Sequence, residues 1–231
     1  MGRGVGRSHA PSEENGTSPE SLTDLAYIKL EELIVRLDLA PGTVVSEQML
    51  SERLGIGRTP IREALQRLAR ERLVRILPQR GVIVSDIDVR SQLRLLEVRR
   101  EVERLVARSA ARRANSKERK EFTELAREFE RSAKTEDDET FMRIDRAFNE
   151  LCLQAARNDF ATGAMRLMNS LSRRFWYVHN KEAADMPEIA KLHAGISRAI
   201  AMGDESAAAA ALDRLLDNVE AFTRATIDSS V

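Results

Sequence analysis

The sequence is poor in cysteine and in aromatic residues. Cys152 is the only cysteine, and aromatic residues make up 4% of the chain. A single cysteine excludes an intrachain disulfide and any zinc site built from several cysteines. Because Cys152 stands between two leucines, we expect it to be a buried structural thiol rather than a reactive one.

Long apolar runs are also absent. No run approaches the roughly 18 to 20 residues that a membrane-spanning helix needs, and the N-terminus lacks the apolar segment of a signal peptide. Hydrophobic residues make up 42% and charged residues 32%, which is typical of a globular protein. We therefore expect a cytoplasmic protein without a membrane partner, with room for one large or two ordinary domains in 231 residues.

The chain has no net charge, but its arginines are unevenly distributed. The 37 basic and 37 acidic residues cancel, which argues against a protein that coats nucleic acid by overall charge. Between Ser51 and Gly81, however, eight arginines and no lysine accompany three glutamates. The planar guanidinium suits phosphates and guanine edges. This surplus indicates a nucleic-acid-binding face, and a solvated charged helix is the alternative.

The N-terminal part is expected to form a disordered tail followed by a small domain. Residues 1–22 are rich in Gly, Ser, Glu and Pro without periodicity, which is typical of disorder. Residues 23–85 then show a helical pattern, a turn, a short helix between Ser46 and Gly55, and a third helix with Thr59 as its expected N-cap. Two short β-like runs close the segment. This order predicts a helix-turn-helix with a two-stranded wing.

Residues 91–227 show only long amphipathic patterns. They run over about 92–114, 117–134, 138–156, 161–178, 188–202 and 205–227, with polar breaks between them. Six helices of this length predict an antiparallel helical bundle. The expected fold class is mainly α, with an N-terminal winged helix-turn-helix and a C-terminal all-helical bundle.

The N-terminal domain carries a specific set of short motifs. They are Pro41-Gly42, Ser46-Glu47-Gln48, Leu50-Ser51-Glu52, the stretch 55–65 (GIGRTPIREAL), and Arg80-Gly81. Together they closely resemble the winged-helix signature of the GntR family over about Thr23 to Val84. The resemblance implies a DNA-binding transcription regulator, and we expect a homodimer on double-stranded operator DNA.

The second helix of a helix-turn-helix enters the major groove by its N-terminal residues, here Arg58, Thr59 and Arg62. The family resemblance implies DNA contacts at Arg58 and Arg62, and at the wing tip. The expected DNA-binding residues are Gln48, Arg58, Thr59, Arg62, Arg80 and Gly81.

The C-terminal domain shows a looser resemblance. The stretches 96–103, 145–149, 192–196 and 199–204 are similar to the FCD effector domain of the FadR subfamily, over roughly Ser91 to Thr226. This implies a small-molecule effector, most commonly an organic acid. Because arginine pairs bidentately with carboxylates, Arg99 and Arg174 are the expected anchors, with Arg173 as an alternative to Arg174; each could equally be a surface arginine.

Many FCD domains hold a divalent metal with one aspartate and three histidines. Asp145 and His193 match this pattern, whereas Asn149 and Leu215 stand where two histidines are expected, and Asn218 lies one turn beyond. The remaining set of Asp145, Asn149 and His193 is poor for Zn²⁺ and suits at most a weakly held harder ion. Two alternatives stay open: these residues bind an effector directly without metal, or His193 is a core histidine.

The sequence thus predicts a regulator whose operator affinity is controlled by a small effector, and not an enzyme. A DNA-binding dimer with a decayed effector pocket is one alternative. A metal-dependent enzyme with an accessory DNA-binding domain is the other, and it is disfavoured because no complete metal site or paired nucleophile and base is recognisable.

Overall fold

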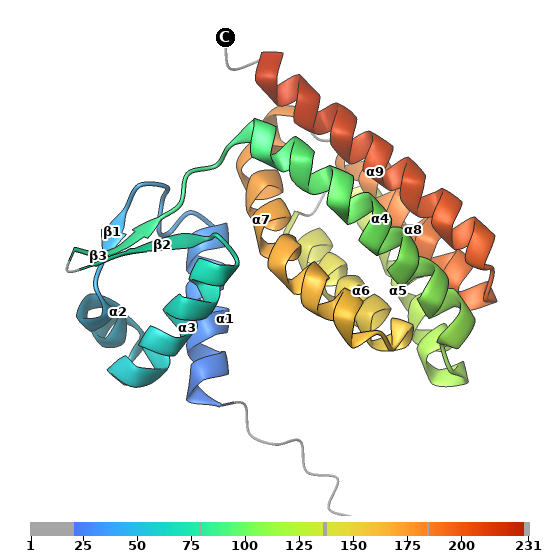
Figure 1. The fold of residues 1–231 in the computed structure, drawn as a ribbon. Helices are drawn as coiled ribbons and strands as arrows, with labels where there is room; N and C mark the ends of the chain where they lie inside the picture. Colours follow the sequence, from blue (N-terminus) through green and yellow to red (C-terminus); the bar gives the residue numbers. More distant parts are fainter. Residues whose placement is uncertain (1–20, 79, 136–137, 184, 229–231) are drawn as a thin grey trace, which may run out of the picture.

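The computed structural model describes residues 21–78, 80–135, 138–183 and 185–228. They form a small N-terminal domain and a helical bundle, joined by a short linker that ends at Asp88 (Figure 1). Most of the predicted tail lies outside the described residues. The tail's expected end at residue 22 is wrong, because Ser21 already caps the first helix by accepting a hydrogen bond from the Asp24 backbone, and Leu22 begins it.

The N-terminal domain contains three helices, α1 (Leu22–Val35), α2 (Glu47–Leu54) and α3 (Arg58–Arg70). Ser46 caps α2, and Gly55 ends it with a left-handed backbone (φ 65°), both as predicted. The expected N-cap of α3 is wrong: the helix begins at Arg58 after Gly57, so Thr59 lies in its first turn. The winged-helix core closes on completely buried side chains from all three helices and the following turn, namely Leu30, Leu50, Ile61, Leu68 and Leu73.

The wing has one strand more than predicted. Strands β2 (Val74–Leu77) and β3 (Gly81–Val84) form the expected antiparallel hairpin. A further strand, β1 (Val44–Val45), pairs with β3 and makes the sheet order β1-β3-β2. Two residues are too few to show an alternating pattern, which is why β1 escaped sequence reasoning.

The described part of the C-terminal domain forms the six predicted helices (Figure 1). They are α4 (Val89–Arg113), α5 (Ser116–Thr135), α6 (Asp138–Ala156), α7 (Asp159–Ala183), α8 (Met186–Met202) and α9 (Glu205–Asp228). Cys152 is buried in their core, as expected, and burial raises its pKa well above the ordinary value. None of the helices described is long and apolar enough to cross a membrane.

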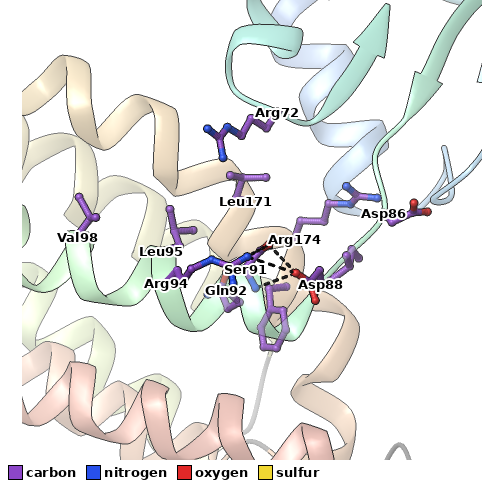
Figure 2. Close-up of a pocket in the computed structure, with 12 residues that line it drawn as sticks. Arg72, Asp86, Asp88, Ser91, Gln92, Arg94, Leu95, Val98, Leu171 and Arg174 are labelled. Carbon is purple, nitrogen blue, oxygen red and sulfur yellow. Dashed lines mark hydrogen bonds and ion pairs between the residues drawn. The ribbon is translucent and has the colours of Figure 1, made fainter. Parts of the chain in front are cut away.

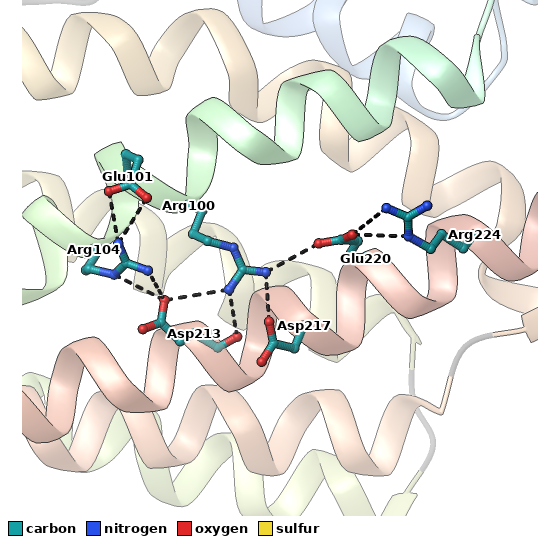
Figure 3. Close-up of polar contacts among 7 residues, drawn as sticks. All are labelled: Arg100, Glu101, Arg104, Asp213, Asp217, Glu220 and Arg224. Carbon is teal, nitrogen blue, oxygen red and sulfur yellow. Dashed lines mark hydrogen bonds and ion pairs between the residues drawn. The ribbon is translucent and has the colours of Figure 1, made fainter.

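Two sets of contacts fix the bundle helices relative to one another and to the N-terminal domain. Helices α4 and α9 lie side by side and are joined by a network of ion pairs centred on Arg100, which contacts Asp217 at 2.8 Å and Glu220 at 3.5 Å (Figure 3). Arg104 adds a 2.7 Å contact to Asp213. Helix α7 faces the N-terminal domain and packs against α1 (Figure 1). The bundle therefore meets the winged helix through α7, while α4 is fixed on α9.

Candidate functional sites

The N-terminus of α3 presents open polar groups. Its cap residue, Gly57, has no side chain to satisfy the first backbone N–H groups. Arg58 and Thr59 follow in the first turn, and Arg62 lies one turn further along the same face; all three are exposed. Free amides and guanidinium groups at a helix N-terminus form a site for phosphate oxygens.

Glu47 on α2 holds the two arginines of this face. Its carboxylate accepts hydrogen bonds from Arg62 Nε at 2.8 Å and Nη2 at 2.7 Å, and lies 3.9 Å from Arg58. The hydrogen bond from Arg62 is the main cause that holds the pKa of Glu47 below its ordinary value. Sequence reasoning missed Glu47, although it stands inside the quoted Ser46-Glu47-Gln48 motif. Both arginines of this face are thus paired with Glu47 in the absence of DNA.

The other expected DNA contacts are accessible too. Gln48 is exposed and donates a hydrogen bond to Glu52 at 3.0 Å, and Arg80 is exposed at the wing tip. Not every arginine of the surplus between Ser51 and Gly81 is exposed on the expected DNA-binding face, however. Arg67 lies over the Tyr27 ring, 3.5 Å from its centroid, and pairs with Asp24 and Glu71 inside the domain. Only part of the surplus is therefore available to DNA.

Gly81 has a structural reason to be glycine. Its φ is +97°, and a Cβ there would lie 2.8 Å from the Val45 carbonyl oxygen of the neighbouring strand. We expect Gly81→Ala to destabilise the domain by about 1–3 kcal/mol, because it adds both a strained backbone and a clash. Chemical denaturation of both proteins measures the difference. Gly163→Ala, at a helical position with open space around it, is the matched control and should be neutral or stabilising.

The helical bundle contains a cavity of about 90 Å³, lined by both polar and apolar side chains. Four of the five expected effector residues line it: Arg99 on α4, Asp145 and Asn149 on α6, and His193 on α8. Leu215 on α9 lines it too, whereas Asn218 is not among its walls. The structure therefore brings together, from four helices, side chains that sequence reasoning could connect only by resemblance.

Both ring nitrogens of His193 make polar contacts. Its Nδ1 lies 2.8 Å from the Ile189 carbonyl oxygen, and its Nε2 lies 3.2 Å from Asp145 Oδ1. Which ring nitrogen donates in these two contacts depends on the tautomer of the imidazole. Burial tends to raise the pKa of Asp145, but the contact with His193 and the charges of Arg173 and Arg99 leave it lowered.

The charged groups of the cavity form pairs. Arg99 Nε donates to Glu103 on the same helix, and Asp145 faces His193. Arg173 on α7 also lines the cavity, and its Nη1 donates to Glu31 of α1 at 2.8 Å. Two buried donors of the cavity walls, Arg173 Nε and Trp176 Nε1, have no hydrogen-bond partner within the described residues.

Both parts of the chain match known families. Residues 22–84 match the family model "Bacterial regulatory proteins, gntR family", and residues 94–218 match the "FCD domain" model. The chain is a GntR-family regulator with an FCD domain. It thus belongs to a family of DNA-binding transcriptional regulators, as the sequence predicted.

Relatives and a solved structure agree with this assignment. The chain is 26% identical to the transcriptional repressor RspR of Escherichia coli, over 91% of each protein. It is 29% identical to the galactonate operon transcriptional repressor of E. coli, over 80% of this chain and 90% of that protein. The structure of E. coli McbR/YncC superposes with a TM-score of 0.74 at 19% identity, over 90% of this chain and 99% of that one, which confirms the fold.

The FCD cavity lacks a complete set of zinc ligands among the described residues. Asp145 and His193 are close together, but no group of three or more His, Cys, Asp or Glu side chains suited to a metal occurs within the described ranges. Asn149 donates its amide to the Asp145 carbonyl oxygen at 2.9 Å, and Leu215 is a buried apolar wall. Zinc sites take at least three strong protein ligands, so two are too few.

We therefore expect chelation to leave the GntR regulator unchanged. Dialysis against EDTA should not lower the melting temperature, because His193 and Asp145 satisfy each other without an ion. Elemental analysis and thermal unfolding before and after dialysis measure this. A stoichiometric metal whose removal lowers the melting temperature by several degrees would contradict it.

Arg174, the remaining expected effector residue, does not face the FCD cavity. It lies at the junction of the two domains, where it lines a separate cavity of about 360 Å³ with Arg72 and Asp86 (Figure 2). Only 1% of it is exposed, and its Nη2 donates to the Ser85 carbonyl oxygen of the linker at 2.6 Å. Successive residues of a helix point about 100° apart, so Arg173 and not Arg174 reaches the FCD cavity.

Proposed function

We propose that this GntR regulator binds a palindromic operator as a homodimer and releases or engages it in response to a small carboxylate in the FCD cavity. Two copies of α3 would enter successive major grooves, with Arg58, Thr59 and Arg62 toward the bases and phosphates and with Gln48, Arg80 and Gly81 near the backbone. The effector would contact Arg99, Arg173, Asn149 and the pair of Asp145 and His193.

The proposal that the effector is a carboxylate rests on two hydrogen-bond donors that have no partner. Arg173 Nε and Trp176 Nε1 are buried in the cavity wall without an acceptor among the described residues. Leaving a buried donor unsatisfied costs about 1–3 kcal/mol, so a ligand that supplies acceptors there is favoured. A carboxylate is such a ligand, because it accepts from the guanidinium edge and from the indole N–H.

The size of the cavity limits the ligand. Its volume of about 90 Å³ suits a carboxylate with a short chain better than a bulky acid. Larger acids need side chains of the cavity to move. One relative is named after an operon for galactonate, which is itself a carboxylate.

The test uses an operator selected from random duplexes by the purified protein. Its affinity is measured by fluorescence anisotropy at fixed salt, with and without each member of a panel of organic acids. We expect at least one acid to change the operator affinity about fivefold or more. Arg99→Gln should abolish that response, while Arg108→Gln, at an exposed position of the same helix, should keep it. If no acid changes either operator affinity or melting temperature, the pocket is a decayed one.

A further inference from the structure

Arg173, a proposed anchor of the effector in the FCD cavity, also contacts the DNA-binding domain. Arg173 lines the FCD cavity and also a second cavity of about 480 Å³ between the domains. On the winged-helix side, Glu31 and Arg67 line this second cavity. Glu31 is 4% exposed, and Arg173 is its ion-pair partner across the domain boundary. The two cavities also share Asn149 and Asn169. The effector cavity thus opens toward α1 at Arg173.

We propose that Glu31 and the effector carboxylate compete for Arg173, so that effector binding opens the ion pair that joins α1 to α7. This inference rests on the proposed function and names the regulation of the same site. The charges around the cavity favour this competition. Within the described residues, each base that lines the cavity already pairs with an acid, so a bound carboxylate that takes one of these bases leaves the acid of that pair without its partner.

The pair that opens is the one across the domain boundary. Arg99 and Glu103 lie four residues apart on α4, which the ion pairs with α9 hold in place (Figure 3). His193 is fixed by the Ile189 carbonyl oxygen and by the Phe129 ring stacked 5.0 Å away. Arg173, by contrast, pairs with Glu31, an acid that belongs to a different domain.

Opening this pair has a mechanical consequence. It leaves the Glu31 carboxylate buried without its partner, which is strongly unfavourable in a low-dielectric contact. The strain is relieved when α1 moves so that Glu31 reaches water. Because α1 also packs on α3 in the winged-helix core, its movement changes the placement of the recognition helix. The coupling is reciprocal: when the winged helix is held where Glu31 pairs with Arg173, effector binding is weakened.

The experiment uses the full-length protein and acetate. Acetate is chosen as a small probe because it consists of a carboxylate and one methyl group. Trp176 is the only tryptophan and lines the cavity, so its fluorescence reports binding at constant ionic strength. Glu31→Gln keeps the shape of the side chain and removes its charge. We expect this variant to bind acetate about fivefold or more tightly than the wild type. Glu32→Gln, whose exposed carboxylate pairs with Arg36 on the same helix, should bind like the wild type.

Amide hydrogen exchange over Leu22–Val35 gives a second readout. Acetate should raise exchange there in the wild type and in Glu32→Gln, whereas in Glu31→Gln exchange should be raised already and unchanged by acetate. Equal or weaker acetate binding by Glu31→Gln would overturn the competition and leave the carboxylate pocket standing. No fluorescence response to acetate in any variant would overturn both. If Glu31→Gln does not fold, Glu31→Asp, which shortens the reach to Arg173, is expected to tighten acetate binding in the same direction.

Discussion

Arg62→Ala should weaken operator binding by roughly ten- to a hundredfold and relax the preference for one base position. Arg62 lies one turn from the open N-terminus of α3, where a recognition helix reads the major groove. An arginine that contacts a guanine edge by two hydrogen bonds loses both when it is truncated. Arg58→Ala should weaken binding in the same way, because Arg58 shares this face.

The Glu47 contact does not offset this loss. Arg62 must leave Glu47 to reach DNA, but ion pairs at the surface contribute little to stability, and here Arg62 is 55% and Glu47 26% exposed. We expect Glu47 instead to hold the guanidinium near the position from which it contacts DNA and, once released, to disfavour a misplaced phosphate by repulsion. Its expected influence is therefore on discrimination between sequences more than on overall affinity.

The measurement is anisotropy on the selected operator and on single-base variants of it, at more than one salt concentration. Arg70→Ala is the matched control, since it removes the same charge from the exposed last turn of the same helix. Weakening that is equal on every sequence would mean that Arg62 contacts phosphate and not a base. Unchanged affinity in both Arg58→Ala and Arg62→Ala would contradict the assignment of α3 as the recognition helix.

Sequence reasoning reached the elements that local chemistry dictates. The Ser46 cap, the left-handed Gly55 and the six bundle helices all follow from residues within a few positions of one another. Thr59 was misassigned because Ser, Thr and Asp are the usual caps, whereas here the cap is Gly57. Local rules thus describe most of the scaffold and miss a cap residue that has no side chain.

The cavity shows the other limit. Asp145 and His193 were connected through a family pattern, but the contact between Glu31 and Arg173 joins residues 142 positions apart on different domains. No periodicity or spacing encodes such a contact. The choice between Arg173 and Arg174 likewise depends on the rotation of α7, which packing against α1 on one side and the bundle on the other determines. Long-range packing thus decides which arginine faces the FCD cavity.

The stability of the FCD domain depends heavily on Phe129. Its ring is completely buried, stacks on His193 at 5.0 Å, and meets the Phe148 ring edge-on at 5.8 Å and the Phe141 ring at 6.0 Å. Phe129→Ala should lower the free energy of unfolding by about 3–5 kcal/mol, because it removes a fully buried ring and leaves a cavity. Chemical denaturation followed by circular dichroism measures the change.

Phe160→Ala is the control for this substitution, since it removes the same side chain from a position that is 93% exposed. It should change the free energy of unfolding by no more than about 0.5 kcal/mol. Because Phe129 also supports the His193 ring, its loss should weaken the acetate response of Trp176 even in the fraction that stays folded. A Phe129→Ala protein that is destabilised as expected but binds acetate normally would mean that the contacts to Ile189 and Asp145 alone orient His193.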